Sequence, residues 1–130
     1  MNILTTTISR IIFGIPMLIF GLGHLLNGSE MSAMIPLPGP LILNYIAGSG
    51  LVLAAVAIFI NKKAKLACLL FAAELLIFIV TLHIPKMMGI GDVSMFCDSM
   101  EMMAQVGMIH AMKDFALMGG ALAFAGLLKD

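Results

Sequence analysis

Long apolar runs are the feature that most restricts how this chain can fold. Each run is close to the roughly 20 residues that an α-helix needs to cross a bilayer at about 1.5 Å per residue. Short connections between the runs favour antiparallel neighbours. The sequence therefore predicts an all-α integral membrane protein, an up-down-up-down bundle of four transmembrane helices in one domain over residues 1–130. The predicted helices cover residues 4–26, 41–60, 66–84 and 110–128.

Composition agrees with a membrane location. Hydrophobic residues make up 62% of the chain and charged residues 11%, whereas soluble domains carry about a quarter charged residues. The formal net charge is zero, so no basic surface is available to attract nucleic acid. No small-residue cleavage site follows the first run, so we expect a retained helix rather than a cleaved signal peptide.

Basic residues in the short connections predict the orientation. A lysine-rich turn at residues 61–65 shares one side of the membrane with Arg10 and Lys129, whereas only Lys86 and Lys113 lie on the other. Because cytoplasmic connections are enriched in Lys and Arg, both chain ends should face the cytoplasm. We therefore expect a multi-pass protein of the cytoplasmic (inner) membrane, in contact with the lipid bilayer.

The connection over residues 86–109 is the longest, and a helix start is predicted inside it. Asp98 and Ser99, followed by a glutamate, form a pattern typical of a helix N-cap. This outer loop should be partly helical and run directly into the fourth segment. Cys97 in the loop and Cys68 in the third segment lie on opposite sides of the membrane in this topology, which excludes a disulfide between them.

Small residues at helical spacing predict which helix faces contact protein. In the first segment the stripe comprises Arg10, Gly14, Met17, Gly21, His24 and Gly28. A second stripe comprises Ala47, Gly50, Ala54 and Ala57, and a third comprises Ala116, Gly120 and Ala123. Small residues let membrane helices approach closely, so all three stripes are predicted to be packing seams.

Two charges lie deep in the predicted spans. Charged residues at the centre of a bilayer cost roughly 2.5–3.5 kcal/mol on insertion scales, so they usually have a partner. Helical rise separates Arg10 and Glu74 by about 9 Å along the membrane normal, within the reach of two long side chains. We expect a structural ion pair between Arg10 and Glu74, or a protonated Glu74 bonded to a neighbouring helix, in preference to a proton relay.

A polar cluster is predicted near the outer interface. His110 can reach Asp114 at i, i+4, while Lys113 points slightly aside. Counting the helical rise brings five further residues to about that depth: His24, Asn44, Tyr45, His83 and Lys86.

His83 is a special case within this cluster. It lies nine residues after Glu74, so the two project from opposite sides of an ideal helix. His83 is therefore expected to face lipid headgroups or the loop after Pro85, the residue predicted to end the third helix.

Three histidines at one level raise the hypothesis of a metal or a haem. They come from separate helices without metal-ligand spacing, so no metal site is predicted. A quinone fits better, because its carbonyls need donors such as His, Lys or Tyr and its tail needs an apolar groove. The predicted cofactor-binding residues are His24, His83, His110, Lys113, Asp114 and Tyr45.

Thirteen methionines stand out, many of them between residues 87 and 112. Thioethers bind Cu(I), which makes a copper site one hypothesis. The spacing is irregular, however, and flexible methionines more often fill gaps or form adaptable docking surfaces. Packing against a partner is therefore the favoured interpretation.

Several short motifs resemble those of the DoxX family of small membrane proteins. They are Arg10 with Phe13-Gly14, Phe20-Gly21 with His24, a second span containing Gly48, the lysine turn, His83-Ile84-Pro85, and Lys113-Asp114 followed by residues 116–121. The resemblance covers nearly the whole chain and implies a four-helix fold. It also implies a link to membrane oxidoreductase complexes, including those that pass electrons from thiosulfate to quinone or handle thiol and oxidative stress. The Met-rich connection of residues 87–108 departs from short family members.

The leading functional prediction is a quinone-linked or redox-associated membrane subunit, in which Asp114 orients His110 or accepts a proton and Lys113 bonds a carbonyl. The alternative is a non-catalytic accessory or assembly subunit that holds a membrane partner or further copies of itself. A small-molecule transporter fits less well, because four short spans without broken helices offer little for alternating access. Motifs for nucleotide binding, serine hydrolysis and zinc proteolysis are absent from the sequence.

Overall fold

In the computed structural model, which describes residues 3–90 and 97–128, every regular element is a helix. The elements in chain order are η1 (Leu4–Ile8), α1 (Ser9–Leu26), α2 (Gly28–Ser32), α3 (Pro40–Ile60), α4 (Ala64–Phe78), η2 (Ile79–His83), α5 (Ile84–Met87) and α6 (Met100–Leu127). Two of these, η1 and η2, are π-helical turns continuous with their neighbours. The all-α class predicted from the sequence is confirmed.

Three helices in the described part of the chain are long and apolar enough to cross a membrane. They span Leu4–Leu26, Pro40–Ile60 and Ala64–Met87. The fourth long helix, α6, has 28 residues but includes Glu101, Lys113 and Asp114, and it is not among the three. The structure thus supports a membrane protein, and a fourth membrane crossing remains a prediction.

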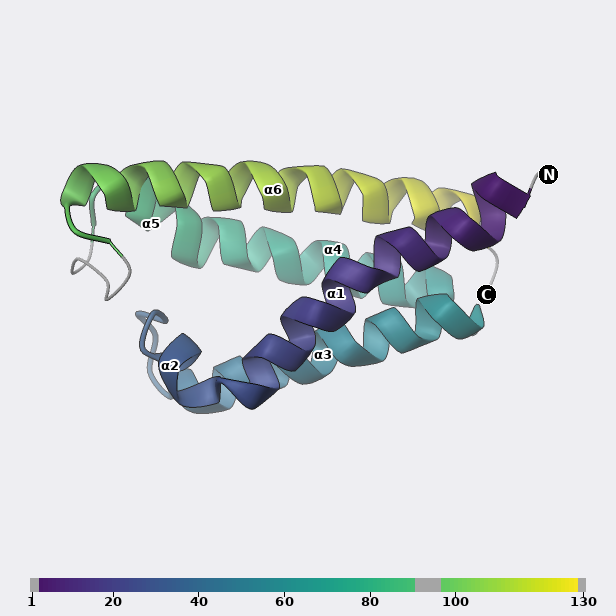
Figure 1. The fold of residues 1–130 in the computed structure, drawn as a ribbon, viewed down its shortest axis with the longest axis horizontal. Helices are drawn as coiled ribbons and strands as arrows, with labels where there is room; N and C mark the ends of the chain where they lie inside the picture. Colours follow the sequence, from purple (N-terminus) through teal and green to yellow (C-terminus); the bar gives the residue numbers. More distant parts are fainter. Residues whose placement is uncertain (1–2, 91–96, 129–130) are drawn as a thin grey trace.

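The long helices form two pairs that converge at one end of the molecule (Figure 1). α1 packs on α3, α4 packs on α6, and the turn after α3 joins the two pairs. The start of η1, that turn and the end of α6 lie at the converging end, whereas α2 and α5 lie at the opposite end. The apolar core fills the converging half of the molecule. Its buried members are Met17, Leu51, Ala54, Ala55, Ile58, Ala67, Cys68, Phe71, Ala72, Leu75, Ala121 and Ala125.

Phe13 joins both helix pairs at the converging end. Its ring centroid lies 6.0 Å from that of Phe71 on α4 and 4.9 Å from that of Phe124 on α6. Such aromatic contacts add about 0.5–1.5 kcal/mol beyond the area that they bury. α1 is therefore anchored to α4 and α6 at this end, although most of its contacts are with α3.

The sequence predicted that the third apolar helix ends at Pro85, and this prediction is wrong. The helix continues through α5 to Met87, with Pro85 in the first turn of α5. Proline lacks an amide donor and its ring clashes with the carbonyl four residues earlier. The chain accommodates the proline through the wider π turn η2 directly before it, so the helix continues in a shifted register.

α6 begins within the long connection, as the N-cap pattern predicted. Ser99 is extended, and its hydroxyl accepts a hydrogen bond from the Met102 amide at 3.1 Å. The helix therefore starts at Met100 rather than at residue 110, and it continues without a break to Leu127.

The small-residue stripe of the first segment faces protein, as predicted. Gly14, Met17 and Gly21 are buried against α3. A Cβ added at Gly21 would lie 2.9 Å from the carbonyl oxygen of Gly48, a distance that leaves no room for a side chain. Glycine at this position lets the backbones of α1 and α3 approach closely.

The stripe predicted in the fourth segment is wrong for two of its three members. Ala116 and Ala123 are exposed, whereas a Cβ added at Gly120 would lie 2.9 Å from the Phe13 ring of α1. The fully buried face of α6 is the opposite one. Its members are Met103, Gly107, Ala111, Asp114, Ala121 and Ala125. They recur at spacings of three, four and seven residues, which place them on one face of α6 together with the Asp114 carboxylate.

Candidate functional site

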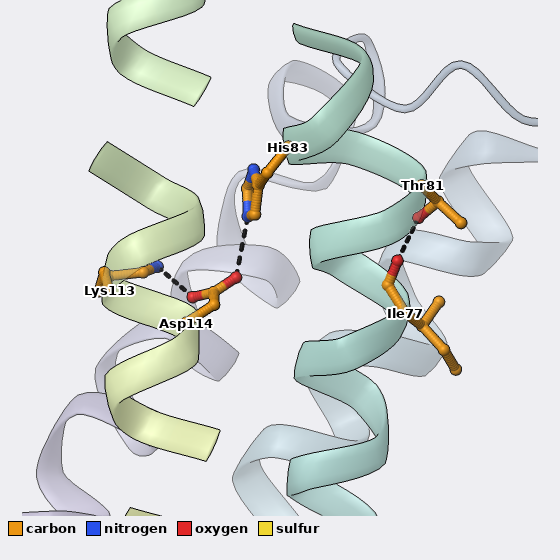
Figure 2. Close-up of polar contacts among 5 residues, drawn as sticks. All are labelled: Ile77, Thr81, His83, Lys113 and Asp114. Carbon is orange, nitrogen blue, oxygen red and sulfur yellow. Dashed lines mark hydrogen bonds and ion pairs between the residues drawn. The ribbon is translucent and has the colours of Figure 1, made fainter. Parts of the chain in front are cut away.

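Asp114 is the centre of the polar cluster. Its side chain is 1% exposed, and its two carboxylate oxygens point to different partners (Figure 2). His83 Nε2 donates to Oδ2 at 2.8 Å, and Lys113 Nζ lies 3.0 Å from Oδ1. The Asp114 carboxylate thus connects a histidine at the end of the α4–η2 helix to a lysine of α6, the helix that carries Asp114 itself.

The predicted pair between His110 and Asp114 is therefore wrong. The prediction that Lys113 points aside is wrong as well, because its ammonium contacts Asp114. The prediction that His83 faces lipid headgroups or the loop is also wrong. His83 is 9% exposed and bound to Asp114. The cause is the π turn η2, whose residues each advance the helix by less than the 100° of an α-helix. This shift of register turns His83 toward the interior.

His110 lies beside the pair rather than in it. Its ring centroid is 5.4 Å from that of His83, with the planes tilted by 49°. Lys113 extends the cluster toward α1, because its Nζ lies 4.4 Å from the centre of the Phe20 ring. Cations over aromatic faces gain about 0.5–1 kcal/mol at exposed sites. Phe20 and Lys113 thus connect α1 and α6 through a side-chain contact at this level.

His24 is fixed by a different partner, Asn44 of α3. His24 Nδ1 donates to Asn44 Oδ1 at 2.6 Å, and Asn44 Nδ2 donates to the His24 carbonyl at 2.7 Å. Asn44 is fully buried. The sequence placed Asn44 at the right depth but missed its role. A buried Asn in an apolar helix was the available signal, since buried amides are nearly always hydrogen-bonded.

Tyr45 does not join the predicted cluster. Its side chain is 42% exposed. It lies against Gly28 and borders a separate shallow depression on α3. Asn44 and Tyr45 are adjacent, so they project about 100° apart around the helix, and only one of them can face inward.

A cavity of about 810 Å³ lies among α1, α3, α4 and α6 on the diverging side of the core. Most of its lining is apolar. Its polar lining includes His24, Glu74, His83, Lys86, His110, Lys113 and Asp114. The three histidines therefore reach one cavity, which the sequence could not determine.

The predicted ion pair between Arg10 and Glu74 is absent, although both residues lie in the described part of the chain. Arg10 Nε donates to the Thr6 carbonyl at 3.2 Å, and its Nη1 is buried without a hydrogen-bond partner. Glu74 lines the cavity, and its Oε1 likewise lacks a partner. The convergence that packs α1 on α3 leaves Glu74 facing the cavity instead of α1.

Neither a metal site nor a disulfide is seen in the described residues. No group of three or more His, Cys, Asp or Glu side chains there could hold a metal ion. Cys68 and Cys97 are both buried, Cys68 in the core and Cys97 at the cavity wall.

Comparisons with protein-family models, with curated proteins and with solved structures find no match to this chain. The fold and the site therefore define its class by themselves. Over residues 3–90 and 97–128 it is all-helical, with three helices able to cross a membrane and an apolar cavity bearing a His–Asp–Lys cluster. The resemblance to the DoxX family stays a prediction.

Proposed function

We propose that this chain is a four-span protein of the cytoplasmic membrane that binds a quinone headgroup, as a redox-associated membrane subunit. The observation that carries the proposal is the cluster of His83, Asp114 and Lys113 on the wall of a cavity of about 810 Å³. Small-molecule sites are typically mostly apolar cavities of about 300–1,000 Å³ with a few convergent polar groups.

The cluster offers both kinds of group that a quinone headgroup needs. Lys113 keeps donors beyond the one directed at Asp114, because an ammonium has three. A quinone carbonyl can accept one of them. Asp114 holds the proton of His83 on Nε2, so Nδ1 of the neutral ring is an acceptor for a hydroxyl of the reduced carrier.

Charge placement supports the proposed membrane topology. Arg10 is the second residue of α1, and the segment before it and the lysine turn after α3 both lie at the converging end, where η1 starts and α6 ends. Under the positive-inside rule this end is cytoplasmic. Pairing Asp114 with Lys113 and His83 lowers the cost of carrying charges in a fourth span. A reporter that is active only in the cytoplasm, fused after Leu128, tests the orientation.

An ultraviolet-visible spectrum of the purified protein in mild detergent, before and after chemical reduction, tests quinone binding. The chain has no Trp and one Tyr, so its own near-ultraviolet background is low. We expect a reducible quinone band that is lost in Lys113→Ala and kept in the matched control Lys62→Ala, which removes a lysine from the distant turn. A silent spectrum after incubation with added quinone and removal of the unbound quinone would reject the proposal.

A second candidate is the accessory or assembly subunit, favoured by one observation. Methionines on the α5 and α6 side of the molecule are exposed: Met88, Met100, Met102, Met108 and Met112. Flexible thioether side chains suit adaptable protein contacts. In this case Lys113→Glu should weaken assembly of a membrane complex, measured by native electrophoresis, without altering any spectrum.

A further inference from the structure

Between α3 and α4, the wall of the cavity opens to the exterior of the molecule. Ile46 of α3 and Ile77 of α4 both line the cavity, yet their side chains are 64% and 58% exposed. A side chain that lines a cavity while more than half of it is exposed lies on the rim of an opening.

Small residues and one unpartnered carboxylate border the opening. Ala47, Gly50 and Ala73 line the cavity at this level. A Cβ added at Gly50 would have the Glu74 carboxylate as its nearest neighbours, with Oε2 at 3.4 Å. Toward the turn, by contrast, Ile58 is fully buried in the core that α3 shares with α4. The seam between α3 and α4 is thus filled by buried apolar side chains near the turn, whereas at Gly50 it is bordered by the Glu74 carboxylate at the cavity wall.

The opening lies near the middle of both helices. Gly50 is at the centre of Pro40–Ile60, and Glu74 is close to the centre of Ala64–Met87. A hydrocarbon core of about 30 Å surrounds the central residues of a spanning helix. At this depth the opening faces acyl chains rather than water, so it admits only a lipid-soluble molecule.

From these observations we infer that the ligand reaches the cavity sideways from the bilayer, between α3 and α4, and carries an apolar tail that stays in this gap. Its polar ring then lies among His83, His110 and Lys113. The inference rests on the proposed function and adds to it the ligand class, a ring headgroup on a long apolar tail, and the path that the ligand takes.

Two quinone probes with the same ring test the inference, one with a long isoprenoid tail and one with a methyl group in its place. Binding of each is measured at equilibrium to the full chain in lipid nanodiscs. Gly50→Leu and Ala73→Leu narrow the gap from its two sides. Gly119→Leu is the matched control, because Gly119 is exposed and a Cβ there would meet nothing within 4 Å.

We expect Gly50→Leu and Ala73→Leu to weaken binding of the tailed quinone by at least about tenfold and that of the tail-less ring by less than about twofold. The control should bind both as the original chain does. An equal loss for both probes, or no loss for either, would overturn the lateral path while leaving the proposed function in place. If the original chain binds neither probe, the proposed function fails, and the inference fails with it.

Discussion

The bond between His83 and Asp114 should be a measurable part of the stability of this protein. Hydrogen bonds to a charged group contribute about 1.5–3 kcal/mol, although bonds between membrane helices average about 0.6 kcal/mol and reach about 1.7 kcal/mol. The bond is 2.8 Å long, and Asp114 is almost fully buried. We therefore expect a coupling free energy near the upper membrane value, about 1.5 kcal/mol.

Lys113 adds little to this figure. Its side chain is 37% exposed, so solvent screens its attraction to Asp114, and exposed pairs contribute at most about 1 kcal/mol. Removing the Asp114 carboxylate should destabilise the protein more than removing His83 or Lys113, because His83 Nε2 is then buried without an acceptor. Asp114→Ala should lower the free energy of unfolding by about 3 kcal/mol.

A double-mutant cycle measures the coupling. Asp114→Ala, His83→Phe and the double variant are unfolded with increasing sodium dodecyl sulfate in mixed micelles, and helix content is followed by circular dichroism. Glu30→Gln, an exposed acidic residue of α2, is the control and should change stability by less than about 0.5 kcal/mol. A coupling below about 0.3 kcal/mol would refute the reasoning, because the two side chains would then act independently.

Three further predictions concern the surroundings of the site. Gly107→Ala should destabilise the protein by about 1–3 kcal/mol in the same unfolding assay, because its Cβ would lie 3.0 Å from the Met87 amide nitrogen. The control Gly119→Ala should have no such cost, and an equal loss of stability in both variants would contradict this prediction. Ser99→Ala should cost about 1 kcal/mol and speed amide hydrogen exchange only in the first turn of α6. Asn44→Leu should leave His24 without its partner and shift its imidazole resonances in nuclear magnetic resonance spectra, whereas unchanged resonances would show that the bond does not form.

The helical class was decided by the sequence alone. Apolar runs of membrane-spanning length are a local property, since each residue either carries an apolar side chain or does not. The Ser99 cap was equally readable, because an N-cap needs only a side-chain oxygen and the amides of the next turn. The buried stripe of Gly14, Met17 and Gly21 followed from helical spacing for the same reason.

The site depended on the tertiary structure. The spacing of Glu74 and His83 predicts opposite faces only for a regular helix, and the π turn before Pro85 removed that regularity. His83 therefore binds the Asp114 carboxylate, which i, i+4 spacing within one helix had predicted to bind His110. Arg10 and Glu74 are about 9 Å apart in depth by helical rise, within the reach of two long side chains, yet they do not pair. Depth along a helix follows from counting residues, but rotation about its axis and the angle between helices arise only from packing, and those two quantities decide which side chains meet.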